Sequence, residues 1–84
     1  MNNIPLIFGL IDAFLFFESA GPEEVNPDSA VKCMEHMTSS LLALSEADQI
    51  ALRCMLEKIS DEAPDQSYRN FVRALPHMIG LAGP

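Results

Sequence analysis

The sequence predicts an all-α fold: a compact bundle of four helices, the last of them short, in a single domain that spans residues 1–84. Apolar residues recur at steps of three and four positions, as they do along one face of a helix. No stretch alternates polar with β-branched residues, and valine and threonine are scarce, so no strand is expected. Hydrophobic residues make up 49% of the chain and charged residues 20%, a composition that excludes intrinsic disorder.

The first helix is expected over residues 4–19. Pro5 suits a first helical turn, and the Ala-Gly-Pro sequence at residues 20–22 ends the helix. Apolar residues cover nearly its whole circumference, so most of its sides need to be covered. The stripe expected to face the core is Leu6, Leu10, Ala13 and Phe17, broadened by Ile7, Ile11, Phe14 and Leu15.

The second helix is expected from Pro27 to about Leu44. Asn26 is a good N-cap, proline is favoured at the first helical position, and Asp28 lies where the helix dipole favours negative charge. Its apolar stripe comprises Ala30, Met34, Met37, Leu41 and Leu44.

The third helix begins at a capping-box-like sequence, in which Ser45 is followed three residues later by Asp48. It is expected to end at about Ile59 or Asp61. Because almost no residues separate it from the second helix, these two are predicted to form a tight helical hairpin. Its core face is expected to comprise Ala47, Ile50, Ala51, Cys54 and Met55, widened by Leu52, Leu56 and Ile59.

The fourth, short helix is expected from about Gln66 to Leu75, after a break at residues 63–65 and before Pro76. Its core face is Tyr68, Phe71, Val72 and Leu75, and Ile79 and Leu81 are expected to pack as a tail. Arg69 and Arg73 are placed together on another face. The first three helices are expected to supply the main core.

Charge and chain length narrow the class of function. Twelve acidic residues against five basic ones give a net charge of −7, which argues against binding to nucleic acid or to an anionic membrane surface.

The apolar run Ile4–Phe17 is too short to cross a bilayer as a helix, which takes about 20 residues. No basic residue precedes Lys32, so the run does not resemble a secretory leader, and a cytoplasmic location is expected.

Cysteine and histidine residues raise two catalytic or metal-binding alternatives. Cys33 and His36 lie three residues apart, and Cys54 and His77 could complete a zinc site with them. Alternatively, Cys33 with His36 or Cys54 with His77 could supply a nucleophile and its base. No paired Cys-x2-Cys motif, glycine-rich loop or Gly-Lys-[Ser/Thr] motif accompanies them. We therefore expect no cofactor and no enzymatic activity, and we expect free, buried thiols that act as small hydrophobic side chains. A disulfide is the alternative in an oxidising compartment.

Two groups of acidic residues flank loops of the predicted fold. The spacing of a calcium-binding loop is missing from both. One interpretation is a solvated rim; the other is a surface that pairs with arginine and lysine on a protein partner. The candidate partner-binding residues are Glu23, Glu24 and Asp28 in the first group and Asp61, Glu62 and Asp65 in the second.

The first helix supplies a candidate anchor. Phe8, Asp12 and Phe16 follow one another at four-residue steps and so share a face. Exposed aromatic rings beside a carboxylate are typical of an interaction site. The alternatives are that the other helices cover this face, or that it mediates self-association into a homodimer.

Four segments carry a resemblance: Val25–Val31, Met34–Met37 with Leu41, Leu44–Asp48, and Tyr68–Pro76 with Ile79–Leu81. In them the chain resembles a group of small, acidic, all-helical bacterial proteins, some of which look like immunity proteins that neutralise a toxin. The resemblance covers roughly residues 25–81, and its motifs are helix caps and core positions. It implies a fold and a role as an inhibitor that binds a basic toxin domain. A homo-oligomeric structural or adaptor protein is the alternative.

Overall fold

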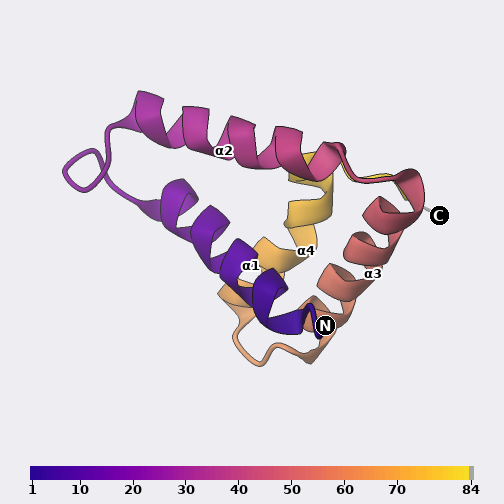
Figure 1. Ribbon diagram of the computed structural model, residues 1–84. Helices are drawn as coiled ribbons and strands as arrows, with labels where there is room; N and C mark the ends of the chain where they lie inside the picture. The colour runs from indigo at the N-terminus through magenta and orange to yellow at the C-terminus, as the bar shows by residue number, and fades with distance from the viewer. Residues whose placement is uncertain (84) are drawn as a thin grey trace. The chain divides into compact units, whose positions relative to one another are not determined.

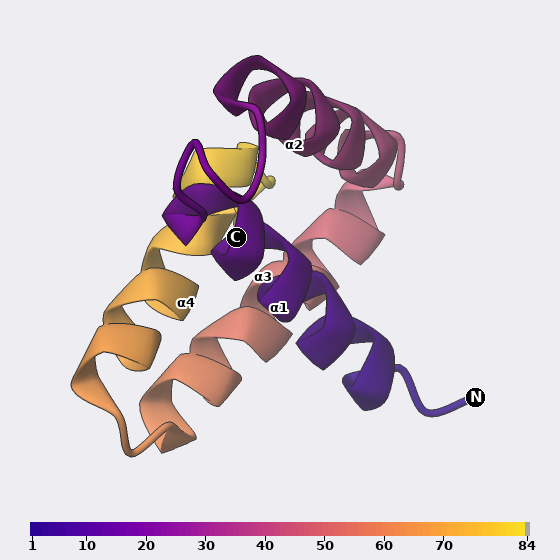
Figure 2. The ribbon, with the colours of Figure 1, turned by 90° about the vertical axis from the view of Figure 1, so that its left-hand side faces the viewer.

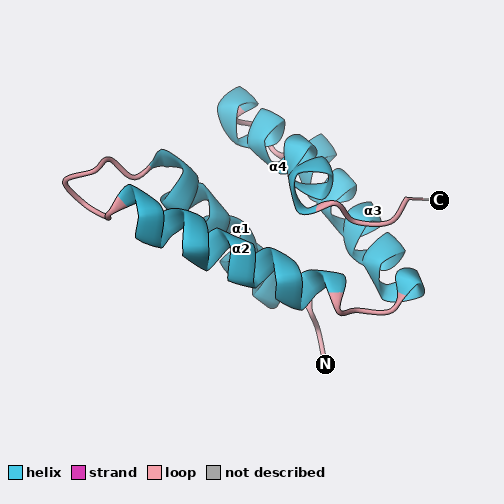
Figure 3. Ribbon diagram, turned by 90° about the horizontal axis from the view of Figure 1, so that it is seen from above, coloured by secondary structure: helices cyan, strands magenta, loops and turns pink. Residues whose placement is uncertain are grey.

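Four α-helices account for most of residues 1–83, the part of the chain that the computed structural model describes (Figure 1). Residues 1–83 contain no strand, and loops alone join the helices (Figure 3). The predicted all-α fold is therefore confirmed, and the fourth helix is the shortest, as expected. The helices are α1 (Ile4–Ser19), α2 (Pro27–Leu42), α3 (Glu46–Glu62) and α4 (Gln66–Ile79).

Contacts within the chain divide it into two units, which are described separately. The first unit is Met1–Met37 and the second unit is Thr38–Pro84, so the division falls within α2. The first unit holds α1, the loop after it and most of α2. The second unit holds the end of α2, all of α3 and α4, and the C-terminal tail.

The helix ends in the first unit follow the capping signals. The predicted bounds of α1 are confirmed, and the amide N–H of Ala20 closes the helix on the carbonyl of Phe16 at 2.8 Å. Asn26 caps α2 as expected: its Oδ1 accepts hydrogen bonds from the amides of Asp28 at 2.9 Å and Ser29 at 3.2 Å. These bonds satisfy two of the amides that the start of α2 leaves without a partner inside the helix, and Pro27 at its first position has no N–H to satisfy.

The buried face of α1 matches only part of the predicted one, namely residues that were expected to broaden the stripe. Ile7, Ile11 and Phe14 are buried, whereas Leu6, which was expected to face inward, is 60% exposed. The reason is that a helix with apolar residues on nearly all sides contains more than one stripe of the right spacing. Periodicity alone cannot choose between such stripes, and the stripe with two isoleucines is the buried one.

A short turn joins α2 to α3 within the second unit. The last residue of α2 is Leu42, two positions earlier than expected, and the Oγ of Ser45 caps α3 by accepting from the amide of Asp48 at 3.1 Å, as predicted. The side-chain amide of Gln49 donates to the carbonyls of Leu42 at 3.1 Å and Leu44 at 3.0 Å. These bonds satisfy one carbonyl at the end of α2 and one in the turn that follows it.

The closest helix pair is α3 with α4, which run side by side in opposite directions (Figure 2). The sequence had assigned the tightest pairing to the second and third helices. The buried residues of α3 are Leu52, Leu56 and Ser60, whereas Ala47, Ala51 and Cys54, expected in the core, are exposed. Burying leucine removes more apolar area from water than burying alanine or cysteine, so the leucine face of α3 is the one that packs.

The fourth helix continues through Pro76 instead of stopping there. Pro76 is fully buried within α4, and the helix ends at Gly80, whose φ of 87° is the left-handed conformation that favours glycine. The amides of Gly80 and Leu81 both donate to the carbonyl of Pro76 at 3.0 Å. Burial of the proline ring and this C-terminal cap offset the helix bond that Pro76, without an N–H, cannot donate.

The fourth helix contributes more to the buried interior than the sequence suggested. Val72, Leu75, Pro76 and Ile79 of α4 are buried, and Leu81 is buried behind it, as predicted for a packed tail. By contrast, Ala30 is the buried residue of α2. The expectation that the first three helices supply the main core is therefore wrong with respect to α4.

Candidate functional site

The aromatic face of α1, defined here as Phe8, Asp12 and Phe16, is exposed. Phe8 is 42% and Phe16 is 48% exposed, and Asp12 between them is exposed too. Four helical residues rise about 6 Å, so the carboxylate lies one turn from each ring along the helix. The ring of Phe16 meets that of Phe17 edge to face, with centroids 5.5 Å apart. A carboxylate flanked by two exposed rings offers both charge and apolar area.

The first acidic group lies in the same unit as this face. Glu23 and Glu24 are exposed in the turn after α1, and Asp28 is exposed in the first turn of α2. The amide of Gly21 approaches Glu24 Oε1 at 3.5 Å, a long contact that leaves this carboxylate largely available to solvent. With six acidic residues and one lysine, the first unit carries a net charge of −5.

The second acidic group lies in the second unit, and two of its members have structural partners. Asp65 caps α4, its Oδ2 accepting from the amide of Tyr68 at 2.8 Å. Asp61 forms an exposed ion pair with Arg73 at 3.7 Å. Glu62 is exposed at the last position of α3. Helix capping and pairing explain Asp65 and Asp61 without a partner protein.

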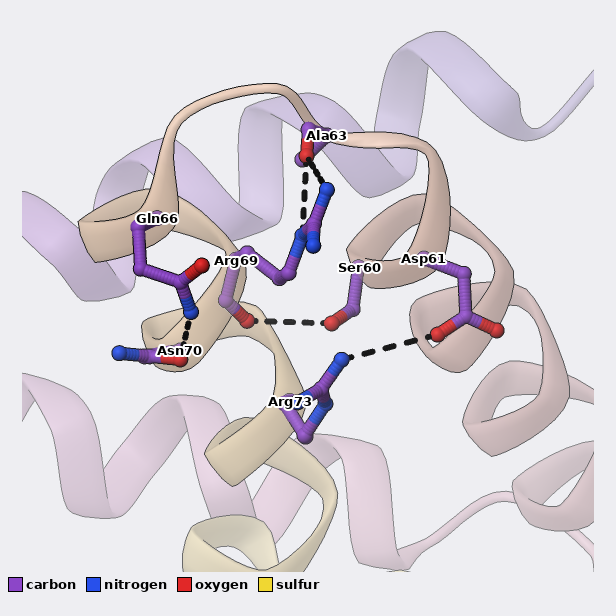
Figure 4. A network of polar contacts seen from close by, with 7 residues as sticks. All are labelled: Ser60, Asp61, Ala63, Gln66, Arg69, Asn70 and Arg73. Carbon is purple, nitrogen blue, oxygen red and sulfur yellow. Dashed lines mark hydrogen bonds and ion pairs between the residues drawn. The ribbon is translucent and has the colours of Figure 1, made fainter.

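A polar network joins the end of α3 to α4 (Figure 4). The guanidinium of Arg69 donates to the carbonyl of Ala63 from Nε at 3.0 Å and from Nη2 at 2.6 Å. The buried Ser60 hydroxyl donates to the carbonyl of Arg69 at 3.1 Å. Arg69 and Arg73 were expected together on one face, but Arg69 is half-buried and bonded to the backbone, while Arg73 is exposed. The break at residues 63–65 was the sequence signal for this contact of Arg69. A break ends a helix, and a helix end leaves carbonyls that need hydrogen-bond donors.

A second set of bonds, which the sequence analysis missed, holds the C-terminal tail. Arg53 donates to the carbonyl of Leu81 from Nη2 at 2.7 Å and to that of Ala82 from Nε at 3.2 Å. The amide of Ala82 donates to Oε1 of Gln49 at 3.1 Å. Gln49 and Arg53 lie one turn apart on α3 and therefore present their polar ends to the same stretch of backbone.

The cysteines and histidines do not assemble the alternative zinc site. No group of three or more Cys, His, Asp or Glu side chains within residues 1–83 is arranged to hold a metal ion. Both cysteines are free; Cys33 is half-buried with its Sγ 4.0 Å from the sulfur of Met37, and Cys54 is exposed. The expectation of a buried thiol is therefore wrong for Cys54, because α3 packs through its leucine face.

None of the helices in the described part of the chain is both long and apolar enough to cross a membrane. Comparisons with protein-family models, with curated proteins and with solved structures found no match to this chain. The case for function therefore depends on the geometry and charge of the two units.

Proposed function

We propose that this protein acts by binding, and that it binds a basic protein partner through the aromatic face of α1 together with the acidic residues Glu23, Glu24 and Asp28. The observation that carries this proposal is that two exposed phenylalanines and a charge of −5 occur together in the first unit. Aromatic side chains anchor protein interfaces, and charge complementarity accelerates and orients association.

The division of labour within the surface follows from the chemistry of its parts. Phe8 and Phe16 supply apolar area, and Asp12 pairs with an arginine or lysine that the partner places between the rings. Exposed carboxylates around the loop contribute to steering rather than to affinity, because solvent screens them. Asp61, Glu62 and Asp65 belong to the second unit, and we assign them a secondary role at most.

We further propose that the partner is a toxin and that this protein is an immunity or antitoxin-type inhibitor. Small size, strong acidity and the resemblance to immunity proteins support it. An inhibitor of this kind works by covering the basic active site of the toxin or a surface next to it, and needs no chemistry of its own.

Co-expression with the product of the neighbouring open reading frame tests the proposal. We expect the two proteins to purify as a complex and the cells to be protected from that product. Changing Phe8→Ala or Phe16→Ala should weaken the complex roughly 30-fold or more, as expected for anchor residues. Val31→Ala, which trims another exposed apolar side chain of the first unit, is the matched control and should have little effect. Absence of a complex and of protection would remove the toxin-inhibitor proposal.

Self-association through α1 is the second candidate, because the exposed apolar side chains of this helix include Leu6 as well as Phe8 and Phe16. The charge argues against it, since two copies would bring acidic surfaces together. Light scattering separates the two candidates. A monomer agrees with binding to a different protein. If the protein is instead a dimer, and Phe8→Ala and Phe16→Ala dissociate it, the homo-oligomeric structural or adaptor role would replace the proposed binding of a basic partner.

A further inference from the structure

The C-terminal tail is bound to α3 in the manner of a short peptide bound to a receptor. Beyond the left-handed Gly80, residues 81–83 form no helix. The backbone of Leu81 and Ala82 is held by two side chains of α3 through three hydrogen bonds, between 2.7 and 3.2 Å long. Leu81 as a residue is only 4% exposed. One buried apolar side chain with main-chain hydrogen bonds beside it is how extended peptides are recognised.

The two side chains of α3 recognise backbone atoms and not the identity of the tail's side chains. Nε and Nη2 of Arg53 reach two successive carbonyls, and Oε1 of Gln49 accepts from the amide of Ala82. Beyond Ala82 the tail has room, because a Cβ at Gly83 would lie 3.7 Å from Nε of Arg53, an ordinary van der Waals contact. The buried Leu81 is therefore a position at which the site selects for a side chain.

The side chain of Gln49 is held by contacts other than those with the tail. Both hydrogen-bond contacts of the Gln49 side-chain nitrogen go to the α2–α3 turn, to the carbonyls of Leu42 and Leu44. The side-chain oxygen of Gln49 is thus oriented towards the tail by contacts in which the tail takes no part. Fixing a donor or acceptor before the ligand arrives reduces the entropy lost on binding.

We infer that Gln49 and Arg53 form a binding site for an extended peptide that carries a leucine-like side chain, and that residues 81–82 of this chain occupy the site in cis. A partner segment with the same pattern, an apolar residue followed by one with a free amide N–H, takes the site when the tail detaches. This inference does not depend on the function proposed for the first unit. The tail is tethered next to its site, so the free peptide has to compete with a local concentration on the order of millimolar.

The test uses the full chain with the tail weakened by Leu81→Asp, since a carboxylate does not replace a buried leucine side chain. The probe is the capped peptide acetyl-Gly-Leu-Ala-Gly-amide, titrated while the NMR signals of the Gln49 and Arg53 side chains are followed. We expect saturable shifts in the Leu81→Asp protein and at least a tenfold weaker apparent affinity in the unchanged protein. The same peptide with aspartate in place of leucine should produce no saturable shift.

Two matched changes on α3 locate the binding site. In the Leu81→Asp background, Arg53→Met should abolish binding of the peptide, whereas Lys58→Met, which removes the same charge from an exposed position, should not. The milder Leu81→Ala serves if Leu81→Asp does not fold, and it should give an intermediate affinity together with faster hydrogen exchange of the Ala82 amide. The inference is overturned by a lack of saturable shifts in both tail variants, by equal binding to the unchanged protein, or by binding that survives Arg53→Met.

Discussion

The two units of this protein differ in how their side chains are used. In the first unit, the side-chain hydrogen bonds join residues two to four positions apart, as helix caps and turns do. In the second unit, such bonds reach from Arg69 back to Ala63 and from Arg53 and Gln49 to residues 28 to 33 positions away. The second unit thus satisfies its helix ends and tail internally.

The difference in charge points the same way. The first unit has a net charge of −5, whereas six acidic and four basic residues give the second unit −2. The exposed phenylalanines are all in the first unit. Exposed rings and uncompensated charge are the features on which the proposed binding role of the first unit depends, whereas the internal hydrogen bonds of the second unit stabilise its own fold.

The largest effect on stability is expected in the second unit, from Leu56→Ala. Leu56 is completely buried in α3, so the change leaves a cavity and should lower the free energy of unfolding by about 2–5 kcal/mol. Chemical denaturation measures this value. Leu6→Ala removes the same atoms from the exposed side of α1 and should change the free energy by less than about 0.5 kcal/mol. Similar losses for both leucines would mean that the buried face of α1 described above is wrong.

The next effect distinguishes two arginines on α4. Arg69→Met removes both donors from the carbonyl of Ala63 and should cost about 1.5–3 kcal/mol, because hydrogen bonds to charged groups are strong. Arg73→Met breaks only the exposed pair with Asp61 and should cost less than about 1 kcal/mol. Thermal unfolding of the two variants in parallel provides the measurement, and an equal loss for both would contradict the internal role of Arg69.

The smallest effect is expected at the start of α2, in the first unit. Asn26→Ala removes the side-chain acceptor of the Asp28 and Ser29 amides and should cost about 1 kcal/mol. Faster hydrogen exchange of those two amides would show that the cap, and not a distant region, is affected. Lys32→Ala, at an exposed position further along α2, is the control, and exchange that responds equally to it would argue against capping by Asn26.

Local signals in the sequence were sufficient for most helix ends. The bounds of α1 and the capping roles of Asn26 and Ser45 are confirmed, because a cap depends on residues within three positions of itself. Pro76 misled the prediction for the opposite reason. Whether a helix continues past a proline depends on whether burial and capping further along the chain offset the lost hydrogen bond. Here they do, and α4 continues to Ile79.

Faces and long-range polar contacts were less accessible to prediction. Leu6 and Ile7 are equally apolar, so the sequence could not say which one α1 buries. The bonds of Arg53 and Gln49 to residues 81–82 join parts of the chain that only the tertiary fold brings together. The partner-binding roles of Phe8, Asp12 and Phe16 stay a prediction, although their exposure leaves them available.

The three-residue connection between α3 and α4 has a consequence for the kinetics of folding. Ser60, Ala63 and Arg69 are joined across no more than nine positions of the chain, so closing this helical hairpin requires little loop entropy. Helical proteins dominated by such short-range contacts fold in microseconds to milliseconds. The bond between Ala82 and Gln49 spans 33 positions, so we expect the hairpin to form early and the tail to dock as a later event.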